Sequence, residues 1–214
     1  LIFSSDIVQE PHPGPSAFKF SLIFKINILI TIILADILHI AECALRPYAK
    51  DRQQLMSVLE QAEHILLDAF LSKTYLIKVP RAVKKIGKIF AQLPRYNMNI
   101  PLIYVTGEFF ANLAHNEGNY NLRRFVSDEG CEVIPGLFTQ RVLYDNWRRM
   151  KEASRAITYA QSKKEKKFWQ KSLRRQKFSS YIVLKFWNHY KKMLNPLQFG
   201  GRADLFNLDE LAVL

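Results

Sequence analysis

Residues 101–147, PLIYVTGEFFANLAHNEGNYNLRRFVSDEGCEVIPGLFTQRVLYDNW, contain the pattern that decides the fold. The apolar residues 102–106 predict a buried strand, and a polar loop follows them. A helix of about ten residues is expected near 120–129, and a second buried strand is expected at 131–134, after a turn at Gly130. A strand, a loop, a helix and a strand of this combined length make one βαβ unit. We therefore expect two parallel strands joined by a right-handed crossover.

The loop at 107–119 is where we expect a ligand, because ligands of such units bind beyond the carboxyl ends of the strands. Glu108 directly follows the first strand and is the candidate catalytic residue, since a carboxylate there can orient a substrate group or transfer a proton. The alternative is that Glu108 braces the loop by accepting hydrogen bonds from backbone amides.

Three asparagines and a histidine follow Glu108: Asn112, His115, Asn116 and Asn119. We take Asn116 and Asn119 as candidate ligand-binding residues, although asparagine also suits left-handed turns. His115 alone is a weak catalytic candidate.

Arg123 and Arg124 lie in the first turns of the expected helix and are further ligand-binding candidates. A phosphate or carboxylate could be held there by the arginines and by the free amides of the helix. The alternative is that both arginines face solvent. Gly107 and Gly118 match neither the dinucleotide-binding nor the Walker spacing of glycines.

The first half of the chain, from 18 to 96, is expected to be mainly helical, and residues 1–17 read as a linker or a severed loop. Residues 20–40 are very apolar, but Lys25 and Asp36 interrupt them, which leaves less than the roughly 20 residues that a membrane span needs. We expect two buried elements instead of a span, a β-rich piece at 22–33 and a helix at 35–45.

Two more helices are expected before residue 96. Asp51 is expected to cap a helix whose buried face recurs every three or four residues, as Leu55, Val58, Leu59, Ala62, Leu66 and Phe70. A weaker helix is expected at 80–93. The remaining residues, 97–214, then form the α/β part.

Residues 141–192 are strongly basic and predict long helices, with 16 Lys or Arg against three acids. This excess exceeds the net charge of +12 of the whole 214-residue chain. Aromatic residues are interleaved with the basic ones, which would also suit nucleic acid. We favour a pair of charged helices, within 141–195, whose aromatic rings lie on the inner face.

The two cysteines, Cys43 and Cys131, do not form a C-x-x-C motif and suit a reducing cytosol. A cluster of iron and sulfide needs several thiolates. No iron–sulfur cluster or other metal site can therefore be assigned within this chain.

Several stretches, taken in order, resemble the C-terminal domain of the 2-hydroxyacyl-CoA dehydratase family and its activase-linked relatives. The matching stretches are 35–38, Arg46-Pro47-Tyr48, 103–105, Gly107-Glu108-Phe109-Phe110, 116–121, Gly130-Cys131-Glu132-Val133 and 143–147. No single one of them is diagnostic, and the resemblance rests on their order.

The resemblance implies a partial Rossmann-like or flavodoxin-like sheet in a cytoplasmic lyase. The intact system would remove water from a 2-hydroxyacyl-CoA after a one-electron reduction through [4Fe-4S] clusters, with an ATP-dependent activase or a second dehydratase subunit as partner. This chain lacks the cluster cysteines, so it resembles a fragment that is not active alone. The rival readings are a basic module that binds nucleic acid and a structural or electron-transfer partner subunit.

Overall fold

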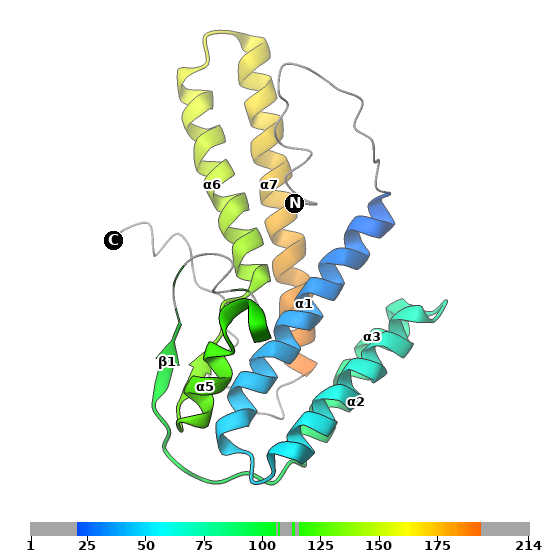
Figure 1. Cartoon of the computed structure of the whole chain (residues 1–214). Helices are drawn as coiled ribbons and strands as arrows, with labels where there is room; N and C mark the ends of the chain where they lie inside the picture. Colours follow the sequence, from blue (N-terminus) through cyan, green and yellow to red (C-terminus); the bar gives the residue numbers. More distant parts are fainter. Residues whose placement is uncertain (1–20, 106, 108–112, 114–115, 194–214) are drawn as a thin grey trace.

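The computed structural model describes residues 21–105, 107, 113 and 116–193, and these are mostly helical with one small parallel sheet (Figure 1). The helices and strands in chain order are α1 (Leu22–Leu45), the 3₁₀ turn η1 (Arg46–Tyr48), α2 (Arg52–Leu71), α3 (Tyr75–Ala91), β1 (Leu102–Tyr104), the 3₁₀ turn η2 (Asn116–Asn119), α5 (Leu122–Asp128), β2 (Glu132–Ile134), α6 (Phe138–Tyr159) and α7 (Lys163–Met193).

The predicted parallel pairing is confirmed. β1 pairs with β2 in parallel, with Leu102 opposite Glu132, Ile103 opposite Val133 and Tyr104 opposite Ile134. The helix between them, α5, has seven residues and is shorter than expected. The coarse prediction of parallel strands joined through a helix therefore holds, within a protein that is more helical than a doubly wound sheet.

The expectation that both strands are buried is wrong for β1. Leu102, Ile103 and Tyr104 are 52%, 37% and 44% exposed, whereas Glu132 and Val133 in β2 are buried. The reason is that α1 and α5 both pack against β2. In the described part of the sheet, β1 pairs only with β2 and lies on the side away from α1.

The apolar segment at 22–45 is one α-helix, so the predicted β-rich piece at 22–33 is wrong. The Ser21 hydroxyl caps its N-terminus by accepting a hydrogen bond from the Phe24 amide. Its buried residues lie on several faces, because α2, α6, α7 and β2 all contact it. Burial on several faces hides the 3.6-residue period by which a helix is recognised.

α1 also has the length and apolarity of a membrane span. The stretch Ile23–Tyr48 reaches a mean hydropathy of 2.2, and 61% of its most apolar window is buried inside the structure. Core helices of soluble proteins and leader sequences pass the same criterion, so this property is weak evidence of membrane insertion.

Two helical hairpins pack around α1. In the first, α2 runs beside α3, and the predicted Asp51 cap is confirmed, because its carboxylate accepts hydrogen bonds from the Gln53 and Gln54 amides. The predicted buried face of α2 is confirmed at Leu55, Leu59, Ala62 and Leu66. α3 begins at Tyr75, earlier than expected, and contains Pro80 in its second turn.

The second hairpin is α6 with α7, whose outer halves rise beyond the other labelled elements in Figure 1. Two of its rings, Trp187 and Tyr190, lie in the same core cluster as residues of α1, α2 and α3. The expectation that the rings lie on the inner face is wrong for Phe168, Phe178 and Tyr181, which are 52%, 66% and 58% exposed.

Candidate anion-binding pocket

A pocket lies where α5 and β2 pack on the C-terminal half of α1. Its empty volume is about 380 Å³, including space open to solvent. The lining residues come from α1 and η1, from the turn and helix at 119–127, and from β2: His39, Glu42, Cys43, Arg46, Asn119, Asn121, Arg123, Arg124, Ser127 and Val133.

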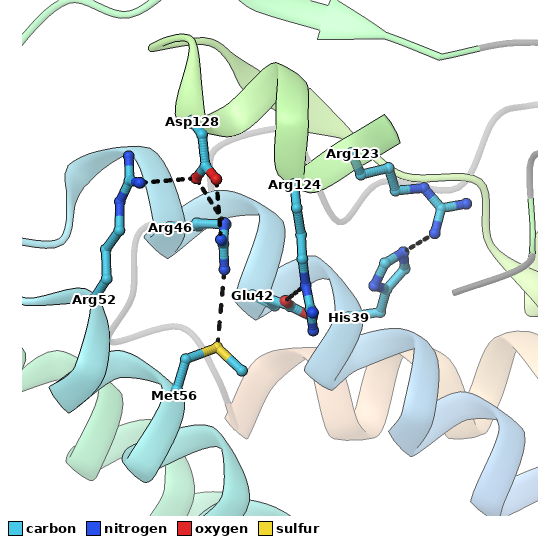
Figure 2. A network of polar contacts seen from close by, with 8 residues as sticks. All are labelled: His39, Glu42, Arg46, Arg52, Met56, Arg123, Arg124 and Asp128. Atoms are coloured by element: carbon cyan, nitrogen blue, oxygen red, sulfur yellow. Dashed lines mark hydrogen bonds and ion pairs between the residues drawn. The ribbon is translucent and has the colours of Figure 1, made fainter. Parts of the chain in front are cut away.

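Ion pairs join α5 to α1, η1 and α2 at the edge of this pocket (Figure 2). Arg46 contacts both carboxylate oxygens of Asp128, with Nε 3.2 Å from Oδ1 and Nη2 3.4 Å from Oδ2. Arg52 reaches the same carboxylate at 3.1 Å, and Arg124 lies 3.6 Å from Glu42. The short helix α5 is thereby held in place by charged side chains at both of its ends.

A partly buried hydrogen bond joins β2 to η1. The Tyr48 hydroxyl donates to Oε2 of Glu132 at 2.9 Å, and Glu132 is 1% exposed. Backbone bonds support the same junction, because the Tyr96 amide donates to the Tyr48 carbonyl and the Glu132 amide donates to the Pro101 carbonyl. Arg46-Pro47-Tyr48 and Gly130-Cys131-Glu132-Val133, two stretches that carry the resemblance, are therefore in direct contact.

Arg123 is the most unusual residue of the pocket. It is 6% exposed, and its Nη1 donates to Nε2 of His39 at 2.7 Å (Figure 2). A guanidinium has no acceptor, so Nε2 of His39 must accept. Nε and Nη2 of Arg123 are buried and have no hydrogen-bond partner among the described residues. Burial lowers the pKa of this guanidinium, although a guanidinium stays charged at neutral pH.

Two neutral groups of the pocket also have buried polar atoms without partners among the described residues: Oδ1 of Asn119 and Oγ of Ser127. Asn119 is 7% exposed and Ser127 is 2% exposed. Buried polar atoms are almost always hydrogen-bonded, so this concentration of unsatisfied atoms around one cavity indicates a binding site for a polar ligand or ordered water.

The backbone entering α5 adopts an uncommon conformation. Tyr120 and Asn121 have φ angles of 55° and 54°, in the left-handed region that costs an L-residue with a Cβ atom free energy. Asn121 lines the pocket, whereas the side chain of Tyr120 is 94% exposed. The conformation turns the chain from η2 into α5 at the pocket wall.

The predicted site residues have different outcomes. Glu108, Asn112 and His115 lie outside the described residues, and Asn116 lies in η2 with its side chain also outside them. Asn119, Arg123 and Arg124 are brought together in the pocket. The alternative in which both arginines face solvent is wrong for Arg123, because α5 presents it to His39 of α1.

Sequence reasoning missed His39, Asn121 and Ser127 as pocket residues. His39 lies 84 residues before its partner Arg123, and no motif joins the two. A signal was present at His39, since a histidine one turn after Asp36 in an apolar helix requires polar partners from elsewhere.

Neither cysteine is placed as a metal ligand. Within the described ranges no group of three or more His, Cys, Asp or Glu residues could hold a metal ion. Burial, followed by the charge of Glu42, raises the pKa of the Cys43 thiol to about 12.

No protein-family model matches this chain, and no match was found among curated proteins or among solved structures.

Proposed function

We propose that the pocket between α1, α5 and β2 binds a small ligand through a carboxylate or phosphate group that pairs with Arg123. One observation carries this proposal: Nε and Nη2 of a buried guanidinium have no partner among the described residues. These two nitrogens form one edge of the guanidinium, the edge that binds an oxyanion with two parallel hydrogen bonds.

The same edge is used elsewhere in this protein. Nε and Nη2 of Arg46 bind both oxygens of the Asp128 carboxylate. Arg123 offers a ligand the equivalent pair of donors, in a more buried place. Charge-assisted hydrogen bonds strengthen in the lower dielectric of a buried site, so this edge of Arg123 would bind an oxyanion well.

We further propose that the chain is part of a protein similar to the 2-hydroxyacyl-CoA dehydratases, with a partial Rossmann-like sheet and an acyl-CoA as the ligand. The order of the matching stretches supports this assignment, and so does the contact of Tyr48 with Glu132 between two of them. Coenzyme A carries phosphates and an acyl group can carry a carboxylate, which are the groups that Arg123 would bind.

The chemistry of the intact system would need more than this chain offers. By resemblance, iron–sulfur clusters supply the electron for a cytoplasmic dehydration, and an ATP-dependent activase or a second subunit delivers it. The described residues hold no ligand set for such a cluster, so we assign no step through one. The part that this chain would supply is binding and orientation of the anionic group.

Thermal unfolding tests the pocket directly. Inorganic phosphate, acetate and coenzyme A are added separately to the wild type and to Arg123→Met, which removes the charge and keeps the volume of the side chain. A ligand at 100 times its dissociation constant stabilises by about 2.7 kcal/mol, which raises the melting temperature of a chain of this size by roughly 5–10 °C. We expect this increase in the wild type and none in the variant.

The control is Arg148→Met, which removes a guanidinium from an exposed pair with Glu152 on α6. It should respond to the ligands as the wild type does. Arg123→Met leaves the buried Nε2 of His39 without its donor, so some loss of stability is expected, and melting without ligand shows whether the variant folds. Equal stabilisation of Arg123→Met and the wild type by every anion would refute the proposal.

A further inference from the structure

The exposed face of α7 carries a row of positive charges. The first five recur at intervals of three or four residues, apart from the adjacent pair at 174 and 175, and the last lies 14 residues after Lys171, which places all six along one side of the helix. They are all exposed: Lys164, Lys167, Lys171, Arg174, Arg175 and Lys185. We call this row the α7 stripe, and it extends over about 32 Å at 1.5 Å per residue.

No carboxylate interrupts the α7 stripe. Glu165 is the one acidic residue in the sequence between 163 and 193, and it lies about a quarter turn away from Lys164. Its carboxylate accepts a hydrogen bond from the Gln161 amide at the start of the helix. Within α7, the positive potential of the stripe is therefore not neutralised by a neighbouring acid, and it favours an extended anion.

Three aromatic rings lie within the same face. Phe168, Phe178 and Tyr181 are 52%, 66% and 58% exposed. Phe178 stands between Lys171 and Lys185 in the seven-residue repeat, and Tyr181 follows Arg174 by the same interval. Lys185 also lies over the Tyr181 ring, with its Nζ atom 5.9 Å from the ring centroid. Rings and cations are thus interspersed on one face of the helix.

We infer that the α7 stripe binds single-stranded nucleic acid, with the cations on phosphates and the exposed rings stacked on bases. This combination of a cationic track with solvent-accessible rings is how proteins hold single strands without reading their sequence. The outer half of the α6–α7 hairpin rises beyond the other labelled elements (Figure 1), and the six cations of the stripe are exposed.

Two other anionic partners fit the stripe less well. Lysine is depleted in protein–protein interfaces, yet it supplies four of the six charges here. A helix on a lipid surface separates an apolar face from a charged one, whereas here the rings lie among the charges. The experiment below therefore also tests whether an acidic protein or an anionic membrane binds the stripe instead.

Fluorescence anisotropy with a labelled oligothymidine of about 16 nucleotides measures the binding. Six phosphate contacts on a single strand predict a loss of affinity of about 300-fold between 50 and 200 mM salt. Lys164→Gln, Lys167→Gln and Lys171→Gln together should halve the slope of log affinity against log salt. The matched control removes three exposed lysines of α3, Lys84, Lys85 and Lys88, and should leave the slope unchanged.

The rings separate single-strand binding from simple charge attraction. Phe168→Ala and Phe178→Ala alter exposed side chains, so both variants should melt within about 2 °C of the wild type. Each should weaken oligothymidine binding at least fivefold. Binding that is insensitive to both ring variants, or that the α3 control weakens as much as the stripe variant does, would overturn the inference.

Competition identifies the partner class. Unlabelled oligothymidine should displace the probe, whereas poly-glutamate and vesicles of phosphatidylserine with phosphatidylcholine should not do so at the same charge concentration. Equal or stronger displacement by poly-glutamate would assign the stripe to an acidic protein. Equal or stronger displacement by vesicles would assign it to a membrane surface, and either result would refute the inference.

Discussion

Asp36 of α1 caps the N-terminus of α6, more than 100 residues further along the chain. Its Oδ1 accepts a hydrogen bond from the Phe138 amide at 3.0 Å, and its Oδ2 accepts one from the Thr139 amide at 2.6 Å. The residue that precedes α6 in sequence, Leu137, has no side chain that can cap. A buried carboxylate that interrupts the apolar stretch of α1 thus satisfies two backbone donors that α6 leaves open.

Asp36→Ala is expected to lower the free energy of unfolding by about 2–4 kcal/mol. It leaves the Phe138 and Thr139 amides without their acceptors, and buried unsatisfied donors cost about 1–3 kcal/mol each. Urea unfolding followed by circular dichroism measures the change. Asp145→Ala, which breaks the partly exposed pair with Arg141 on α6, should cost less than about 1 kcal/mol. Equal costs for the two variants would contradict the role of Asp36.

Tyr48→Phe should lower the free energy of unfolding by about 1–3 kcal/mol, because it removes the hydroxyl that donates to the buried carboxylate of Glu132. Tyr181→Phe removes an exposed hydroxyl and serves as the control, with an expected change within about 0.5 kcal/mol. Urea unfolding of both variants is the measurement. If Tyr48→Phe were as stable as the wild type, η1 and β2 would not be joined by this bond.

Cys43 is expected to react very slowly with iodoacetamide in the folded protein. Its pKa of about 12 leaves roughly one thiol in 10⁴ ionised at pH 8, and only the thiolate reacts. Its rate should therefore rise about tenfold for each pH unit between 7 and 10. Mass spectrometry of native and urea-unfolded samples separates Cys43 from the less buried Cys131. A Cys43 rate that equals the unfolded rate at pH 8 would contradict the prediction.

Tyr120→Gly should raise the free energy of unfolding by up to about 1 kcal/mol. Tyr120 has a φ of 55° and an almost fully exposed side chain, so glycine relieves the left-handed backbone and removes few contacts. Tyr120→Ala keeps the Cβ atom and should bring no such gain. Thermal melting of the three proteins compares them, and a loss of stability in Tyr120→Gly would show that the ring makes a stabilising contact.

The parallel strands, the Asp51 cap and the buried face of α2 could be predicted because each has a local signal in the sequence. The helical conformation of residues 22–45 could not be predicted, because the intrinsic propensity of its isoleucines favours strands. Contacts with α2, α6, α7 and β2 override that preference, and they bury so much of the helix that its period is obscured.

Only part of the candidate site could be predicted, because some of its residues have a local signal in the sequence and others do not. Asn119, Arg123 and Arg124 follow from their place in the βαβ unit. The burial of Arg123 depends on His39, whose approach is a property of tertiary packing and leaves no trace in the spacing of residues. The exposure of β1 also depends on tertiary packing, because the sequence of an apolar strand does not show whether one or both of its faces are covered.

The placement of α1 has a consequence for synthesis on the ribosome. Helix α1 leaves the ribosome first among the described elements, but β2, α6 and α7, which pack on it, are encoded roughly 90 residues or more later. At translation rates of about 5–20 residues per second, its apolar surface stays uncovered by these partners for about 5–30 s. The yield of folded protein therefore depends on which partner first binds this nascent helix: the later segments of its own chain, a chaperone or another nascent chain.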